Sequence, residues 1–384
     1  MKMHALVAAA VGLIACSLAG GIAPTAPSAA EPTAPLAPTN TPIPPTLTPV
    51  PPTPTPLPPA ITSGTVGGLS VFTTLAEGEL VRALAFSPDG AALAAAVGDP
   101  AATIGTIRLL DTASGLPLRT LEGHTSAVWG MAFSPDGRFL ASASRDFTAK
   151  IWDWQSGTLV RSLGFPNEVT AAAFSPDNRT LAVGGVDELP GTPLQDATIW
   201  TFAVDTWEPG LEFAEFWNIP DIVFSPDGGL VVGGGISRNV RVWRAGDGVL
   251  RFILYHPGQV SSIAVSPDGS TVATGLCQQS TNHQCTIGAI WLWDLASGQL
   301  LEKLADFPEG VVDVEFSHDG SAVIGGSRDG TLRAYRMSDY ELLLVTTSSV
   351  GGSPAALIAM AISSDGRFLA TAGNGRINMW RVGP

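Results

Sequence analysis

The residues that most often carry catalysis and metal binding are scarce in this chain of 384 residues, which has 3 cysteines and 5 histidines. It contains no Gly-x-Ser-x-Gly motif, no pair of histidines at a metal-binding spacing and no Gly-rich phosphate loop. Its 20 Lys and Arg face 34 Asp and Glu, and a formal charge of −14 repels nucleic-acid backbones. We therefore expect no enzyme activity, metal, cofactor or nucleic-acid partner.

What the sequence does contain is one phrase repeated seven times, a hydrophobic strand followed by a Ser-Pro-Asp-Gly turn or a variant of it. Its anchor residues are Phe86, Phe133, Phe174, Phe224, Val265, Phe316 and Ile362. The intervals between them are 47, 41, 50, 41, 51 and 46 residues. Short strands repeated at such a period are typical of β-propeller blades, which must stack to bury their apolar faces. The sequence predicts an all-β fold of seven blades, each a four-stranded antiparallel sheet.

The N-terminus has the features of a targeting segment. Lys2 is followed by the short apolar run 5–15, and Leu13–Cys16 resembles the lipobox of bacterial lipoproteins. The resemblance implies a signal peptide over residues 1–16 and lipid on Cys16; the alternative is secretory cleavage near Ala19 or Ala23. It also implies an extracytoplasmic location, with the membrane contacted only through the lipid.

Residues 17–65 are rich in Pro, Thr and Ala, a composition too poor in large apolar groups to fold. We expect an extended linker there, followed by the propeller over residues 66–384. With Cys16 lipidated, Cys277 and Cys285 are left to form a disulfide. The alternative is a metal site that includes the intervening His283, which we consider weaker because it has few ligands.

The segment from Gly123 to Asp153 resembles a WD repeat, because it has a Gly-His start, a Ser-Pro-Asp-Gly hairpin and a Trp-Asp end. The resemblance implies a structural side-chain network of His124, Ser142, Asp146 and Trp152. Other blades keep only parts of this pattern, such as Thr371 with Trp380. TolB-type propellers share such turns, but the Gly-His and Trp-Asp pairs favour the WD-repeat family.

The two ends of the predicted ring complement each other. The strand 69–75 precedes the first repeat and has no blade of its own, while the last blade has no fourth strand. We expect strand 69–75 to complete the seventh blade as its outer strand, because closure removes an exposed sheet edge.

Loop lengths separate odd from even blades. The connections between second and third strands are long in blades one, three and five, at 98–105, 186–196 and 276–286. In the WD-repeat family these loops lie on one face, called the top. We expect them to wall the channel mouth; neutral insertion is the alternative.

Even blades carry an arginine near the same turn, Arg145, Arg238 and Arg328. They form either an anion-binding set on the top face or ordinary surface positions, each balanced by an acidic neighbour. Trp129 and Trp217 precede first strands and are further candidates for partner contact.

These observations favour a monomeric, lipid-anchored propeller that binds or scaffolds a protein through its top face. An enzyme or ligand sensor with a site at the channel mouth is the alternative, and an envelope repeat protein without a discrete ligand is a third reading.

Overall fold

The computed structural model describes residues 58–76, 78, 80–98, 105–185, 197–214, 219–235, 237–281, 284–348, 356–373 and 375–383. Within these ranges the chain is all β, apart from the single-turn 3-10 helix η1 (Val66–Gly68). No helix in this part of the chain combines the length and the apolar character that crossing a membrane requires. The predicted leader with Cys16, most of the linker, the loop 186–196 and Trp217 lie outside the described residues.

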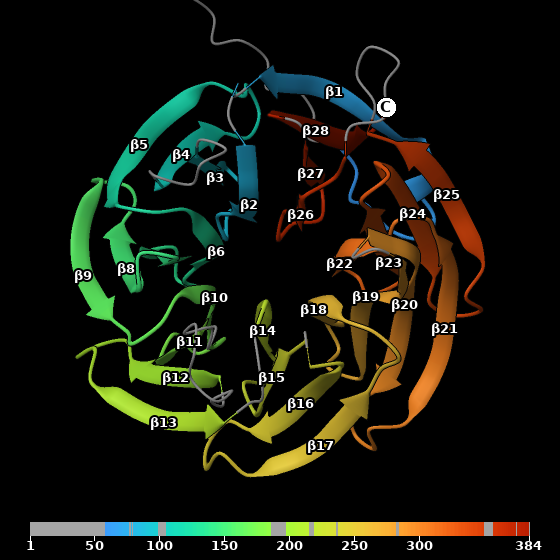
Figure 1. The fold of residues 1–384 in the computed structure, drawn as a ribbon. Helices are drawn as coiled ribbons and strands as arrows, with labels where there is room; N and C mark the ends of the chain where they lie inside the picture. The colour runs from blue at the N-terminus through green and yellow to red at the C-terminus, as the bar shows by residue number, and fades with distance from the viewer. Residues whose placement is uncertain are drawn as a thin grey trace, which may run out of the picture. The chain divides into compact units, whose positions relative to one another are not determined.

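Seven antiparallel sheets of four strands form a ring around a central axis, which confirms the predicted fold class (Figure 1). Blade one contains β2 (Leu80–Phe86), β3 (Ala92–Gly98), β4 (Gly105–Asp111) and β5 (Pro117–His124). Blade two contains β6 (Val128–Phe133), β7 (Phe139–Ser144), β8 (Thr148–Asp153) and β9 (Thr158–Gly164). Blade three contains β10 (Val169–Phe174), β11 (Thr180–Gly185), β12 (Thr198–Ala203) and β13 (Pro209–Ala214). The next two contain β14 (Asp221–Phe224), β15 (Leu230–Gly234), β16 (Asn239–Arg244), β17 (Leu250–Tyr255); and β18 (Val260–Val265), β19 (Thr271–Thr281), β20 (Gln284–Asp294), β21 (Leu300–Phe307). The last two contain β22 (Val311–Phe316), β23 (Ala322–Ser327), β24 (Thr331–Arg336), β25 (Leu342–Thr347); and β26 (Ala359–Ile362), β27 (Phe368–Gly373), β28 (Arg376–Val382), β1 (Leu69–Ala76).

The ring closes through its two ends, as the sequence predicts. Strand β1 pairs antiparallel with β28, from Leu69 opposite Val382 to Ala76 opposite Arg376. Beneath this pair, Ile377, Met379 and Trp380 are almost fully buried. The seventh blade is therefore built from both ends of the described chain, and the outer edge of β28 is paired.

The repeated phrase forms the same hairpin in every blade. In blade four the Ser225 hydroxyl donates to the Asp227 carboxylate at 2.6 Å and accepts the N–H of Leu230 at 2.9 Å. The hydroxyl of Ser225 is the main reason why the pKa of Asp227 lies below its usual value, and Gly228 takes the positive φ of 71° that ends the turn. The same Ser-to-Asp bond occurs in all seven blades, so these aspartates shape turns.

The folded body begins before residue 66, where we placed the end of the linker. Ile61 is fully buried in the core between blades six and seven, and its N–H donates to the carbonyl of Gly366 at 2.6 Å. The N–H of Ser63 donates to the hydroxyl of Ser321 at 2.8 Å. A single isoleucine in a Thr- and Pro-rich stretch gives no periodicity, so composition alone placed this segment with the linker.

Candidate binding face

The two faces of the ring carry different turns, because neighbouring strands run antiparallel. The Ser-to-Asp hairpins joining first to second strands lie on one face, here called the hairpin face. The turns joining second to third strands lie on the opposite face, together with the starts of the inner strands. We call this the mouth face, because the central cavity opens there beside Trp129 and Arg145.

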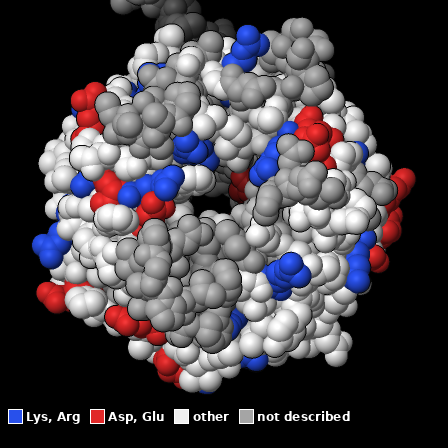
Figure 2. Space-filling model, in the orientation of Figure 1, with Lys and Arg blue, Asp and Glu red and all other residues white. Residues whose placement is uncertain are grey.

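The central cavity has a volume of 1210 Å³ and is lined by the first strand of every blade. Three residues before each anchor residue, blades one, two, three and seven place Ala or Gly on this lining, whereas blades four and six place Asp221 and Asp313. Glu315, also on blade six, completes an acidic side of the channel. Figure 2 shows both basic and acidic side chains around the central opening.

The two channel aspartates join blades to one another. Asp221 accepts the N–H of Ile263 in blade five at 2.8 Å, and Asp313 accepts the N–H of Met360 in blade seven at 2.8 Å. Burial raises the pKa of Asp221 to about 7 and that of Asp313 to about 6. Burial and the charges of these two aspartates also raise the pKa of Glu315. In the described part of the chain, no group of three His, Cys, Asp or Glu residues is arranged to hold a metal.

Two of the predicted arginines occupy equivalent positions at the cavity. Arg145 and Arg328 are exposed, line the cavity and follow the second strand of blades two and six. Their backbone N–H groups donate to the carbonyls of Ala127 and Gly310, each directly before the first strand of the same blade, at 3.0 and 3.2 Å. The adjacent Asp146 is not the counterion of Arg145. The Nε of Arg145 pairs instead with Glu168 of the next blade at 2.9 Å.

Arg238 is not equivalent to the other two arginines. Its carbonyl accepts the N–H of His256 at 2.8 Å, just as the carbonyl of Phe147 accepts the N–H of Phe165 at 2.9 Å. Arg238 and Phe147 also share a φ of 64°. An alignment of the Ser-Arg-Asn triplet of blade four with the Ser-Arg-Asp triplet of blade two is wrong by two residues. Counting back from Trp243 and from Trp152 instead matches Arg238 with Phe147. Arg238 is exposed but is outside the described lining of the cavity.

Trp129 lies at the mouth of the cavity with 40% of its surface exposed. The guanidinium of Arg82, from the inner strand of blade one, lies 4.9 Å from the centre of the Trp129 ring. This cation–π contact holds the indole in place while leaving part of it open to solvent. Trp217, the second candidate tryptophan, lies outside the described residues.

The four residues of the network implied by the WD-repeat resemblance lie together beneath the mouth face. His124 Nδ1 is 2.8 Å from Asp146 Oδ2, and His124 Nε2 is 2.8 Å from Ser142 Oγ. The indole N–H of Trp152 donates to the same Ser142 hydroxyl at 2.9 Å. Burial opposes ionisation of Asp146, but hydrogen bonds from His124 and Thr148 hold its pKa well below the usual range. The network therefore satisfies buried polar groups and joins the end of β5 in blade one to blade two.

Blade five contains a second network that the sequence analysis missed. His256 Nε2 lies 2.9 Å from Thr274 Oγ1, which also accepts the Trp293 indole N–H at 3.3 Å. The spacing from histidine to hydroxyl is 18 residues in both blades. However, the hydroxyl-to-tryptophan spacing grows from 10 in blade two to 19 in blade five. The longer segment between Thr274 and Trp293 hides the likeness to blade two in the sequence. The shared spacing of 18 residues from histidine to hydroxyl would have revealed it.

His256 makes stability depend on pH, because burial lowers its pKa to about 4. The unfolded chain takes up the proton below about pH 6.5, so acidification from pH 6.5 to 4 should lower its contribution to the free energy of unfolding by about 3 kcal/mol. Asp221 and Asp313 act in the opposite sense, since their raised pKa values favour the folded state in acid. The difference between wild type and His256→Gln in urea unfolding at each pH isolates the effect; parallel pH curves for the two proteins would contradict it.

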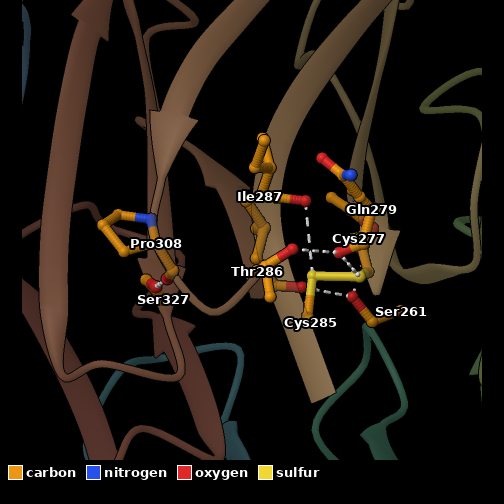
Figure 3. Close-up of a disulfide and its surroundings, with 10 residues drawn as sticks. Ser261, Cys277, Gln279, Cys285, Thr286, Ile287, Pro308 and Ser327 are labelled. Atoms are coloured by element: carbon orange, nitrogen blue, oxygen red, sulfur yellow. Dashed lines mark hydrogen bonds between the residues drawn. A yellow bond between two sulfur atoms is a disulfide. The ribbon is translucent and has the colours of Figure 1, made fainter. Parts of the chain in front are cut away.

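The segment 276–286, expected to be a loop wall, is a continuation of the β19–β20 hairpin. A disulfide joins Cys277 and Cys285 across these strands, and Cys277 lines the cavity (Figure 3). A Cβ on Gly258 would lie 1.7 Å from the Cys277 carbonyl oxygen, and one on Gly310 would lie 2.8 Å from Cys285 Sγ. The hairpin thus packs tightly against the loops on both sides, and only glycine fits at these positions. Most of segment 98–105 and all of 186–196 lie outside the described residues.

Comparison with known families agrees with this geometry. Six segments match the WD40 family, described as "WD domain, G-beta repeat": residues 115–153, 157–188, 215–244, 248–287, 298–336 and 345–381. The chain belongs to the WD40-repeat family. The first matched segment begins just before β5, so β2 to β4 are not matched, and the first blade of this WD40 propeller is recognised by its hairpin and its four-stranded sheet.

Curated WD40 relatives resemble parts of the chain. Autophagy-related protein 16 of Arabidopsis thaliana is 22% identical over 62% of this chain and 44% of its own length. An uncharacterized WD repeat-containing protein of Synechocystis is 32% identical over 43% of this chain and 42% of its own length. Target of rapamycin complex subunit wat1 of Schizosaccharomyces pombe is 27% identical over 53% of this chain and 63% of its own length. The chain thus spans less than half the length of the first two.

Proposed function

We propose that this WD40-repeat chain binds a protein partner through its mouth face, and that lipid on Cys16 holds it at the outer side of a bacterial membrane. The observation that carries the binding proposal is the group at the cavity mouth, where the exposed Trp129 lies under Arg82 and beside the Arg145–Glu168 pair. Tryptophan and arginine are the side chains most enriched where interfaces gain their affinity. The naming of wat1 as a complex subunit accords with such a role.

Two of the three channel carboxylates favour this reading over catalysis at the mouth. One oxygen of Asp221 and one of Asp313 accept a backbone N–H of a neighbouring blade, whereas a general acid or base needs an oxygen directed at its substrate. Burial in the channel raises the pKa values of both carboxylates, and the N–H groups of the neighbouring blades partly offset that rise. A scaffold needs only the rigid ring and an accessible face.

Affinity capture from native membranes tests the proposal. Wild type should fractionate with membranes and retain a specific protein, and Cys16→Ser should lose the membrane fraction. The double variant Trp129→Ala/Arg145→Ala should weaken capture about tenfold or more, as expected for interface hot spots. Leu159→Ala/Arg161→Ala on the outer strand β9 is the matched control. Equal capture by the two double variants would contradict a mouth-face site, and an unchanged Cys16→Ser distribution would contradict the anchor.

A further inference from the structure

One backbone position on the mouth face is occupied by different residues in the even blades. Phe147, Arg238 and Gly330 each sit in the turn before the third strand, and their carbonyls accept the N–H groups of Phe165, His256 and Ser348 at 2.9, 2.8 and 2.8 Å. All three have positive φ, at 64°, 64° and 85°. The position is therefore left-handed because of the turn itself, whichever side chain it carries.

Glycine suits this conformation, as Gly330 illustrates, whereas a bulky aromatic residue there is strained. Phe147 nevertheless occupies it in blade two, with 47% of its surface exposed. In the described part of the chain, its ring makes no aromatic or cation–π contact. About half of this strained residue is thus open to solvent, and strained residues of this kind concentrate at functional sites.

The neighbours of Phe147 supply the rest of a contact surface. Arg145 lies two residues earlier in the same turn, and its backbone N–H bond to Ala127 brings the turn next to the strand that carries Trp129. Arg145 uses its Nε to hold Glu168, and its terminal Nη groups make no hydrogen bond with the described residues. Blade two therefore has two partly exposed aromatic side chains, Trp129 and Phe147. It also has an arginine, Arg145, whose Nη groups can still donate hydrogen bonds.

We infer that Phe147 is the apolar anchor of the partner contact, with Trp129 and Arg145 as its companions, an inference that rests on the proposed function. The partner that fits is a protein segment with an apolar side chain, which covers the phenyl ring, next to a carboxylate, which accepts from the Nη groups of Arg145. A carboxylate is favoured because Glu168 takes only the Nε of Arg145, so the Nη groups can donate to a second planar acceptor.

Photo-crosslinking in the full chain in its native membrane tests the location. The photoreactive residue p-benzoylphenylalanine replaces Phe147 in one variant and Arg238 in the other, so the control has the same φ and also lies on the mouth face. A protein adduct from position 147 with little from 238 supports the inference. An adduct from 238 alone would overturn it while leaving mouth-face binding intact, and no adduct from either would overturn both.

Phe147→Gly tests the strain argument independently. Because glycine fits a left-handed turn, the variant should melt roughly 1–3 °C higher than wild type. In the same protein, capture of the crosslinked partner should fall about tenfold or more. A lower melting temperature would assign Phe147 a role in the fold, and unchanged capture would remove it from the contact; either result overturns the inference.

Discussion

Deleting residues 58–76 is expected to leave the propeller unfolded or aggregated at room temperature. The deletion removes β1 and with it the outer partner of β28. It also removes Ile61, Val66 and Leu69, three almost fully buried side chains. At about 1.5–3 kcal/mol for each, their loss amounts to roughly 5–9 kcal/mol, comparable with the whole stability of a typical domain.

The measurement is thermal unfolding together with size-exclusion chromatography. Deletion of residues 1–57 is the matched control, because it leaves every described strand in place, and it should melt like the full chain. Adding a synthetic peptide of residues 58–76 should restore a monodisperse propeller, since the exposed edge of β28 is a template for strand pairing. A monomeric Δ58–76 protein that melts within a few degrees of the control would show that β1 does not close the ring.

The sequence was sufficient to predict the ring because its signals repeat at every blade. Each Ser-Pro-Asp-Gly turn marks one hairpin, and seven copies fix the number of blades even where the WD40 pattern is weak, as in blade one. The closing strand could be predicted because 69–75 and the last blade each lacked a partner. Both arguments rest on backbone pairing, which leaves a periodic pattern in the sequence.

The features that escaped prediction depend on contacts without such a pattern. Arg145 pairs with Glu168 of the next blade, and Asp221 accepts an N–H from blade five, so neither partner is visible in a single repeat. The network of His256 was concealed by an insertion, and the register of Arg238 was misjudged because a local triplet outweighed the distance to Trp243. Counting from the tryptophan of each blade, which the backbone fixes, would have corrected the register.

Phe147 illustrates the same limit from another side. In the sequence it is one of 15 phenylalanines, and the Ser-Arg-Asp triplet before it, which also precedes Gly330, does not show whether its ring is buried or exposed. Only the positive φ and the exposed ring show that it stands outside the packing. The candidate site in blade two thus depends on a backbone conformation and on side-chain exposure, which the sequence does not show. The blade itself follows from the repeated pattern of strands and turns in the sequence.

Replacing His124 with Ala is expected to destabilise the propeller by about 3 kcal/mol, the second largest effect, because it leaves buried polar groups without partners. Asp146 would lose the imidazole 2.8 Å away while its side chain stays almost fully buried. Ser142 would lose one of the two rings that meet at its hydroxyl. Urea unfolding at pH 7 measures the loss, and Asp153→Ala, at the partly exposed end of β8 in the same blade, is the control, with a much smaller effect.

A double-mutant cycle of His124→Ala and Asp146→Ala should give a coupling of about 1–3 kcal/mol at pH 7, as expected for directly contacting partners. The pKa of Asp146 lies well below its usual value when folded, so the coupling should be fully present above about pH 5 and fade as the pH falls below about 4, where the unfolded chain takes up the proton. Additive losses at pH 7, or a coupling that persists unchanged at pH 2, would mean that the imidazole and the carboxylate support blade two independently of each other.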